Sequence, residues 1–294
     1  MRTVPERLLL RLEWRVVRRL EGRVHGGYRT AHRGSGTDLV GLRGYVEGDD
    51  ARHIDWNVTA RLGEPHLRMF NEDRELTAWL VLDRSASMAV GAPGRGKHDV
   101  LAELALVLAR LFSRGGNRVG ALFYDTGIVG VVPPGTGRRH VLRIGAEFAR
   151  TAGARRGSTT DLAGMLDAAA RLVRRRSLIV AVSDFIGGGD WERSLLRLAP
   201  RHEVVALRVI DAADDELPDA GLIVVEDAET GEQLIVDSGD PLLRARFRAG
   251  AGERDARLDA GMRRAGVPLH RISTADDLAG PLVEVVTRTH RRRA

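Results

Sequence analysis

The residues best suited to chemistry are one carboxylate and two hydroxyls, spaced two apart in Asp83-x-Ser85-x-Ser87. They directly follow the short apolar run from Ala78 to Leu82, which is long enough for a strand buried on both faces. A loop at the carboxyl end of a strand lies where open α/β sheets bind ligands. Carboxylate and hydroxyl oxygens are hard ligands, so the pattern indicates a site for magnesium or manganese.

Asp and Ser after a strand also cap helices and shape turns, so these three residues alone leave a structural role open. Two other stretches favour the metal. The glycine-rich turn 153–161 places Thr159 and Thr160 just before an expected helix, and the apolar run 177–183 ends in Asp184. The carboxyl ends of strands in a doubly wound sheet lie on one edge and can converge. A metal bound mainly by hydroxyls stays under-neutralised, so a partner's Glu or Asp would complete it.

The elements that must position these residues alternate between strand and helix from Thr77 onward. The expected strands are 78–82, 118–124, 177–183, 203–210 and 267–272. The expected helices are 99–113, 138–150, 161–176, 191–198 and 242–265. Residues 127–132 form an antiparallel neighbour ended by Pro133-Pro134, and 222–225 with 233–236 form a hairpin. This alternation predicts an α/β fold with a doubly wound, mostly parallel sheet and helices on both faces.

Residues 38–76 differ in composition from the rest of the chain, being polar and punctuated by aromatic residues. We expect an amphipathic helix over 4–24, a turn at Arg33 to Thr37 and a strand at Leu67 to Phe70. The segment is short for a core of its own, so we predict that 1–76 is a small N-terminal appendage packed on a domain spanning 77–290.

Composition narrows the function classes. The chain has 294 residues, a net charge of +6 and no cysteine, which excludes disulfides, zinc-thiolate sites and a cysteine nucleophile. No stretch approaches the ~20 apolar residues of a membrane span, so we expect no transmembrane segment and a cytoplasmic location. Only 4% of residues are aromatic and basic faces are not interleaved with them, which argues against nucleic-acid binding.

The hydroxyl and carboxylate pattern resembles the metal-ion-dependent adhesion site of von Willebrand factor A-like domains. The matching stretches are Asp83-x-Ser85-x-Ser87, Gly157-Ser158-Thr159 and Ser183-Asp184, in that order. The resemblance implies that Ser85, Ser87 and Thr159 contact Mg²⁺ or Mn²⁺, with Thr160 as the alternative to Thr159. It also implies that Asp83 and Asp184 complete the shell.

A second pattern, Tyr45-x-x-Gly48-Asp49-Asp50-x-Arg52-x-Ile54-Asp55-Trp56, resembles the bacterial family called domain of unknown function 58. That resemblance implies a protein partner, a MoxR-type AAA+ ATPase, and a role in assembling or activating other proteins. It implies no enzymatic activity. The structural alternative for the pattern itself is a turn, an Arg–Asp pair and a packed indole.

Two alternatives remain. A metal-dependent hydrolase could use Asp83 and Asp184, but no general base is evident beside them in the sequence, and the histidines are scattered. Gly91-x-x-x-x-Gly96-Lys97 has the spacing of a phosphate-binding loop, but His98 replaces the hydroxyl that would hold magnesium, so we expect a solvated loop.

Overall fold

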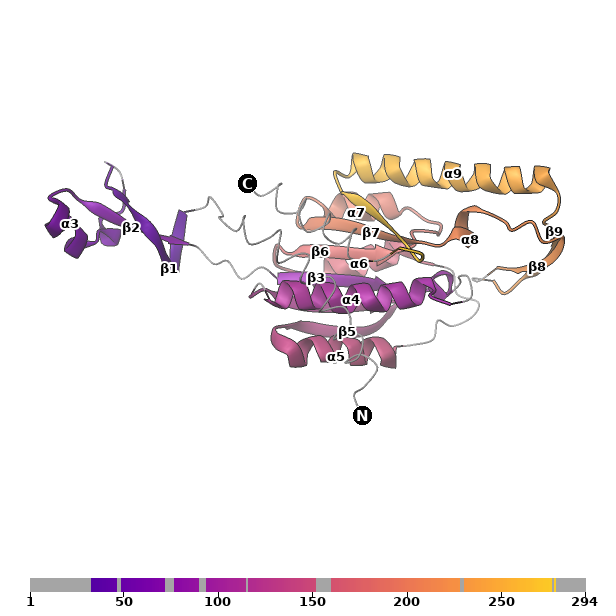
Figure 1. The fold of residues 1–294 in the computed structure, drawn as a ribbon, viewed down its shortest axis with the longest axis horizontal. Helices are drawn as coiled ribbons and strands as arrows, with labels where there is room; N and C mark the ends of the chain where they lie inside the picture. The colour runs from indigo at the N-terminus through magenta and orange to yellow at the C-terminus, as the bar shows by residue number, and fades with distance from the viewer. Residues whose placement is uncertain are drawn as a thin grey trace. The chain divides into compact units, whose positions relative to one another are not determined.

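The computed structural model describes residues 33–46, 49–71, 77–89, 94–114, 116–151, 160–227, 230–276 and 278. They belong to two compact units, 33–71 and 77–278 (Figure 1). The predicted helix over 4–24 and the predicted ligand Thr159 lie outside the described residues. Within the described part of the chain, no helix combines the length and apolar character needed to cross a bilayer.

The larger unit is built on a six-stranded sheet with the strand order β10-β7-β6-β3-β4-β5. Its strands are β3 (Thr77–Asp83), β4 (Arg118–Tyr124), β5 (Ile128–Gly135), β6 (Leu178–Ser183), β7 (Glu203–Ile210) and β10 (Leu269–Ser273). All neighbours pair in parallel except β5, which is antiparallel to β4. The predicted α/β fold with a mostly parallel sheet is therefore confirmed.

Helices cover both faces of this sheet, as predicted. They are α4 (Lys97–Arg114), α5 (Gly137–Arg150), α6 (Leu162–Leu172), α7 (Trp191–Leu198), the short α8 (Ala212–Asp215) and α9 (Pro241–Arg264). Phe123 of β4 contacts Phe148 of α5 on one face. Its neighbours Leu122 and Tyr124 belong to a cluster with α6, α7 and α9 on the other face.

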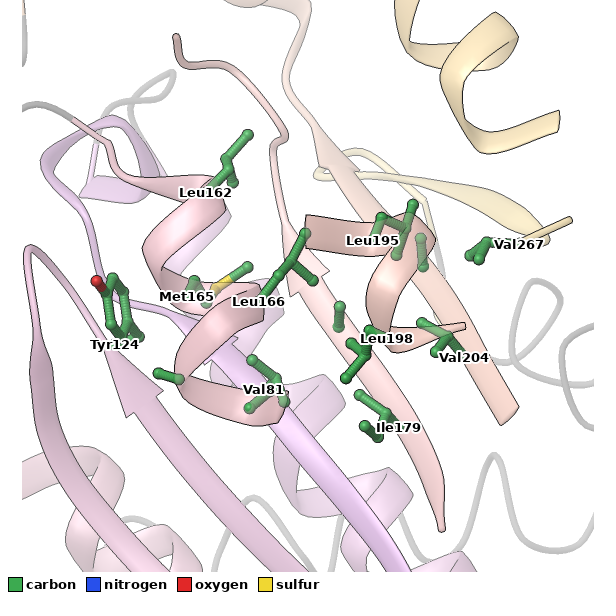
Figure 2. Close-up of a cluster of buried hydrophobic side chains, with 14 of the residues drawn as sticks. Val81, Tyr124, Leu162, Met165, Leu166, Ile179, Leu195, Leu198, Val204 and Val267 are labelled. Atoms are coloured by element: carbon green, nitrogen blue, oxygen red, sulfur yellow. The ribbon is translucent and has the colours of Figure 1, made fainter. Parts of the chain in front are cut away.

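The core explains why the central strands read as continuous apolar runs. Trp79 and Val81 of β3 pack with Met165 and Leu166 of α6 in the cluster shown in Figure 2. The alternate residues of β3 point to the opposite face and are fully buried as well. Strands covered on both sides need apolar residues at every position.

The edge strand β5 differs from the sequence prediction, which ended it at Val132. The strand continues through Pro133 and Pro134 to Gly135. Proline lacks an N–H donor, yet it is tolerated on an edge strand, where one side of the ladder has no neighbour. The predicted hairpin is confirmed as β8 (Leu222–Glu226) and β9 (Gln233–Asp237), which pair antiparallel.

The smaller unit pairs β1 (Arg33–Gly44) with β2 (His66–Asn71), with the 3₁₀ turn η2 (Ala51–His53) and α3 (Trp56–Leu62) between them. The predicted strand at Leu67 to Phe70 is confirmed. The predicted turn at Arg33 to Thr37 instead begins a strand, although the register of that strand shifts between Arg33 and Asp38. A glycine-containing irregularity inside a strand has the same local signal as a turn.

The polar residues of the family-like pattern mostly hold this smaller unit together. Asp49 accepts two hydrogen bonds of 2.6 Å from the Arg43 guanidinium. Asp55 caps α3 and also accepts from Arg68 at 2.9 Å. The expected Arg–Asp pair within the pattern is also present, because Arg52 Nη2 donates to Asp50 Oδ2 at 3.0 Å. The prediction of a packed indole is wrong, because Trp56 is 68% exposed. That 1–76 packs on the domain spanning 77–290 stays a prediction.

Candidate metal centre

The predicted site residues that the structure describes lie at the switch point of the sheet. From β3 the chain passes through α4 to β4 on one side, whereas β6 joins β3 on the other. Leu82 pairs with Val182 in parallel register, so Asp83 and Ser183 leave the sheet side by side. The Ser183 hydroxyl donates to Asp83 Oδ2 at 2.5 Å. Ligands of doubly wound sheets bind at such a position.

Three hydroxyls form a chain beside this carboxylate. The backbone N–H of Ser85 donates to Asp83 Oδ1 at 2.8 Å, which fixes the turn after β3. Ser85 Oγ lies 3.1 Å from Ser87 Oγ, and Ser87 Oγ lies 3.2 Å from Thr160 Oγ1. All three of these hydroxyl-bearing residues are buried. The structure thus brings together side chains that are 73 residues apart in the chain.

The spacing of these oxygens fits a small hard cation. Two ligands on adjacent corners of an octahedron, each about 2.1 Å from Mg²⁺, are about 3 Å apart. The two measured gaps are close to that value. Thr160, the alternative to Thr159, supplies the third hydroxyl. Gly187 also lies against Thr160, because a Cβ there would be 3.0 Å from the Thr160 carbonyl oxygen. Three loops therefore converge.

Asp184 is fully buried, and both of its carboxylate oxygens have hydrogen-bond donors. Oδ1 accepts from the Ile186 N–H at 3.0 Å, and Oδ2 accepts from Lys97 Nζ at 2.9 Å. The same ammonium donates to Asp214 Oδ1 at 2.8 Å. Arg208 Nε donates to the backbone carbonyl of Asp184 at 3.0 Å, which holds the end of β6. Asp184 is therefore held in place directly after Ser183, whose hydroxyl donates to Asp83.

Backbone strain marks the residue after Asp184. Phe185 has a φ of 53°, and it is the single non-glycine residue with a positive φ among those described. A bulky side chain in the left-handed region costs about 1 kcal/mol or more. Its N–H donates to Ser183 Oγ at 2.9 Å, and its ring is buried in the core cluster. Packing therefore holds the strained turn in place.

The electrostatics of the site oppose full ionisation. Burial, together with the charge of Asp184, raises the pKa of Asp83 to about 6. Burial alone would lower the pKa of Lys97, but the carboxylates of Asp184 and Asp214 outweigh it, so the net shift is upward. Lys97 is thus a fixed ammonium. A divalent cation near Asp83 would relieve the repulsion between the two carboxylates.

Arg84 lies within the Asp83-x-Ser85-x-Ser87 loop, but its side chain packs against α5. Its guanidinium lies 3.9 Å from the centre of the Phe148 ring, and its Nη2 donates to the Thr151 carbonyl at 3.0 Å. Burial lowers the pKa of Arg84 to about 10. The side chain is 4% exposed, so it packs on α5 and is not offered to a partner.

Sequence reasoning missed Lys97 and Asp214 as neighbours of the site. One signal existed, because Lys97 is the single lysine among 46 basic residues. The structure also argues against the phosphate-binding loop. The Lys97 ammonium is buried and already binds two carboxylates, so it is not available to a phosphate.

The hydrolase alternative needs a general base beside Asp83 and Asp184. The described residues contain no group of three or more His, Asp and Glu side chains that could hold a metal. The ring of His98, one of the nearer histidines in sequence, packs against Phe148 at 5.0 Å, and burial lowers its pKa.

Comparison with known proteins agrees with the second sequence pattern. The family model described as "Protein of unknown function DUF58" matches residues 41–257. An uncharacterized protein of Mycobacterium bovis is 39% identical over 280 residues, covering 95% of this chain and 88% of that protein.

Two solved structures are similar at low identity. BatB from Bacteroides thetaiotaomicron, a conserved hypothetical protein, has a TM-score of 0.46 at 11% identity, covering 74% of this chain and 99% of that one. The VWA domain of SpRpn10 has a TM-score of 0.38 at 13% identity, covering 72% and 94%. The family assignment rests on the family match and the mycobacterial relative.

Proposed function

The chain belongs to the family of proteins of unknown function DUF58, and from this premise we propose that it is a non-enzymatic protein-interaction module that docks through a divalent metal. The observation that carries the proposal is the chain of buried hydroxyls Ser85, Ser87 and Thr160 beside Asp83 at the switch point of the sheet. These are ligands for a hard cation, and they leave its charge largely uncompensated.

The metal in this proposal is Mg²⁺ or Mn²⁺. Ser85, Ser87 and a threonine of the turn, Thr159 or Thr160, would hold it directly. Asp83 and Asp184 would act mainly through water, because their oxygens already accept hydrogen bonds from protein groups. When bound, the metal would supply a positive centre that a carboxylate of a partner can complete.

The partner we propose is a MoxR-type AAA+ ATPase that offers a Glu or Asp to the metal. The support is the likeness to the domain of unknown function 58 family, together with the chemistry of a cation that lacks an anionic ligand. The chain would then act with that ATPase in assembling or activating other proteins. A cytoplasmic location is part of the same proposal.

The experiment is a pull-down on the immobilised protein from an extract of its own cells, with magnesium or with a chelator. The test variant is Ser85→Ala combined with Ser87→Ala. The matched control is Ser194→Ala, which removes a buried hydroxyl on α7 whose hydrogen-bond partner is Arg197. Bound proteins are identified by mass spectrometry, and Mn²⁺ binding is measured by electron paramagnetic resonance.

We expect an AAA+ ATPase to be retained by the wild type and by Ser194→Ala with magnesium only. The double variant should lose both the ATPase and Mn²⁺. Retention of the ATPase by the double variant in chelator would overturn the metal-dependent docking. Retention of Mn²⁺ by the double variant would place the metal elsewhere. Turnover of phosphate esters that depends on Asp83 would instead support the hydrolase.

A further inference from the structure

A buried ammonium contacts Asp184, one of the two carboxylates of the proposed metal shell. Lys97 is the first residue of α4 and is 1% exposed. Its Nζ donates to Asp184 Oδ2 at 2.9 Å and to Asp214 Oδ1 at 2.8 Å. One partner lies at the end of β6, and the other lies in α8 after β7. The lysine therefore joins the ends of two neighbouring strands at the same edge.

Both carboxylates are held toward this lysine by other bonds. Asp184 Oδ1 accepts from the Ile186 N–H, and Asp214 Oδ2 accepts from the Asp211 N–H at 2.9 Å. Neither carboxylate can rotate away without breaking a backbone hydrogen bond. The ammonium site is thus built by the fold around Lys97, and an arginine, which is larger and planar, would not fit the same space.

A divalent cation bound by the three hydroxyls would experience the positive charge of Lys97. Asp184 is the only carboxylate of the proposed metal shell that Lys97 contacts among the described residues. The carboxylate shares its negative charge with the ammonium, so it attracts the metal less. The ammonium also repels the metal directly, and inside a protein such charges act over several ångströms.

We propose that Lys97 is a built-in cation that lowers the divalent-metal affinity of the free protein by competing for Asp184. This inference rests on the proposed function and names the regulation of the same site. Lys97 is a positioning residue that acts through Asp184, not a metal ligand. The charge of Asp214 has the opposite effect, because it partly neutralises the ammonium.

The test is a charge series measured by Mn²⁺ titration with electron paramagnetic resonance. Lys97→Met removes the positive charge, Asp214→Asn removes a negative charge, and the double variant has the same net charge as the wild type. Lys97→Met should bind Mn²⁺ about tenfold more tightly than the wild type, Asp214→Asn about tenfold more weakly, and the double variant about equally. Loss of structure would weaken binding in every variant, so the opposite signs identify the charge effect.

Lys97→Met leaves two buried carboxylates without their cation, so circular dichroism must show that it folds. If it does not, the same substitution is compared in the Asp214→Asn background. There the double variant should bind Mn²⁺ about tenfold more tightly than Asp214→Asn alone. Equal or weaker binding in a folded Lys97→Met protein, or in that second comparison, overturns the proposal.

The Ser85→Ala, Ser87→Ala double variant separates this inference from the proposed function. If it abolishes Mn²⁺ binding while Lys97→Met leaves the affinity unchanged, the metal centre stands and the role of Lys97 fails. If Mn²⁺ binding survives loss of the hydroxyls, the proposed centre itself fails. Absence of Mn²⁺ binding in every protein overturns both.

Discussion

The buried carboxyl group of Asp83 should make the metal-free protein less stable as the pH rises. The side chain is 2% exposed and lies beside Asp184. Burial and this neighbouring charge raise the pKa of Asp83 from 3.8 to about 6. A shift of about two units corresponds to about 3 kcal/mol of difference between the two protonation states.

The sign follows from proton linkage. At a pH between the two pKa values, the folded state holds a proton on Asp83 that the unfolded state has released, so stability falls as the pH rises. The favourable contribution is full below the unfolded pKa of 3.8 and is lost above the folded pKa of about 6. Between pH of about 4 and about 8 the loss amounts to about 2 kcal/mol.

The assay is urea unfolding of the wild type and of Asp83→Asn in chelator at several pH values. Because asparagine cannot ionise, the stability of Asp83→Asn minus that of the wild type should grow by about 2 kcal/mol from pH ~4 to ~8. Asp276→Asn, at an exposed aspartate, controls for the loss of one charge. A difference that does not change with pH would refute the reasoning. Adding Mg²⁺ should reduce the pH dependence of the wild type, since a bound cation favours the ionised carboxylate.

Three further substitutions test the surrounding structure, and urea unfolding measures the first two. Gly120→Ala should lower the free energy of unfolding by about 1–3 kcal/mol, because the added Cβ would lie 2.8 Å from the Trp79 ring. An unchanged midpoint of urea unfolding would contradict this contact. Tyr124→Phe should cost about 1 kcal/mol by removing the 3.1 Å hydrogen bond to Asp161, the cap of α6; no loss would show that this bond is not formed. Asp55→Ala should speed amide exchange at the start of α3, which it caps; equal exchange rates would argue against the cap.

The sequence was sufficient to predict the central strands and the convergence of the site. The runs that became β3 and β6 are apolar through their centres because both faces of the sheet are covered, and each leads to an aspartate at or just after its carboxyl end. The order of the strands then places Asp83 next to Ser183. These features depend on local composition and on the handedness of parallel connections, which sequence rules capture.

Other features depended on tertiary neighbours that local rules do not describe. Local rules predict that β5 ends before Pro133-Pro134, but the position of this strand at the edge of the sheet decides whether proline is tolerated. The pairing of Lys97 with Asp214 joins residues 117 apart. The indole of Trp56 was expected to pack, yet it is mostly exposed at the start of α3.

The hydrogen bonds around the proposed metal centre also bear on when the centre can form during folding. They join residues 73, 87, 100 and 117 positions apart, whereas the β4–β5 hairpin closes over a few residues. Contacts of long sequence separation form late, since the loop entropy must be overcome first. On a ribosome, Asp83, Ser85 and Ser87 emerge long before Asp184 and Asp214. A nascent chain therefore cannot complete the proposed docking site until most of the domain has been synthesised.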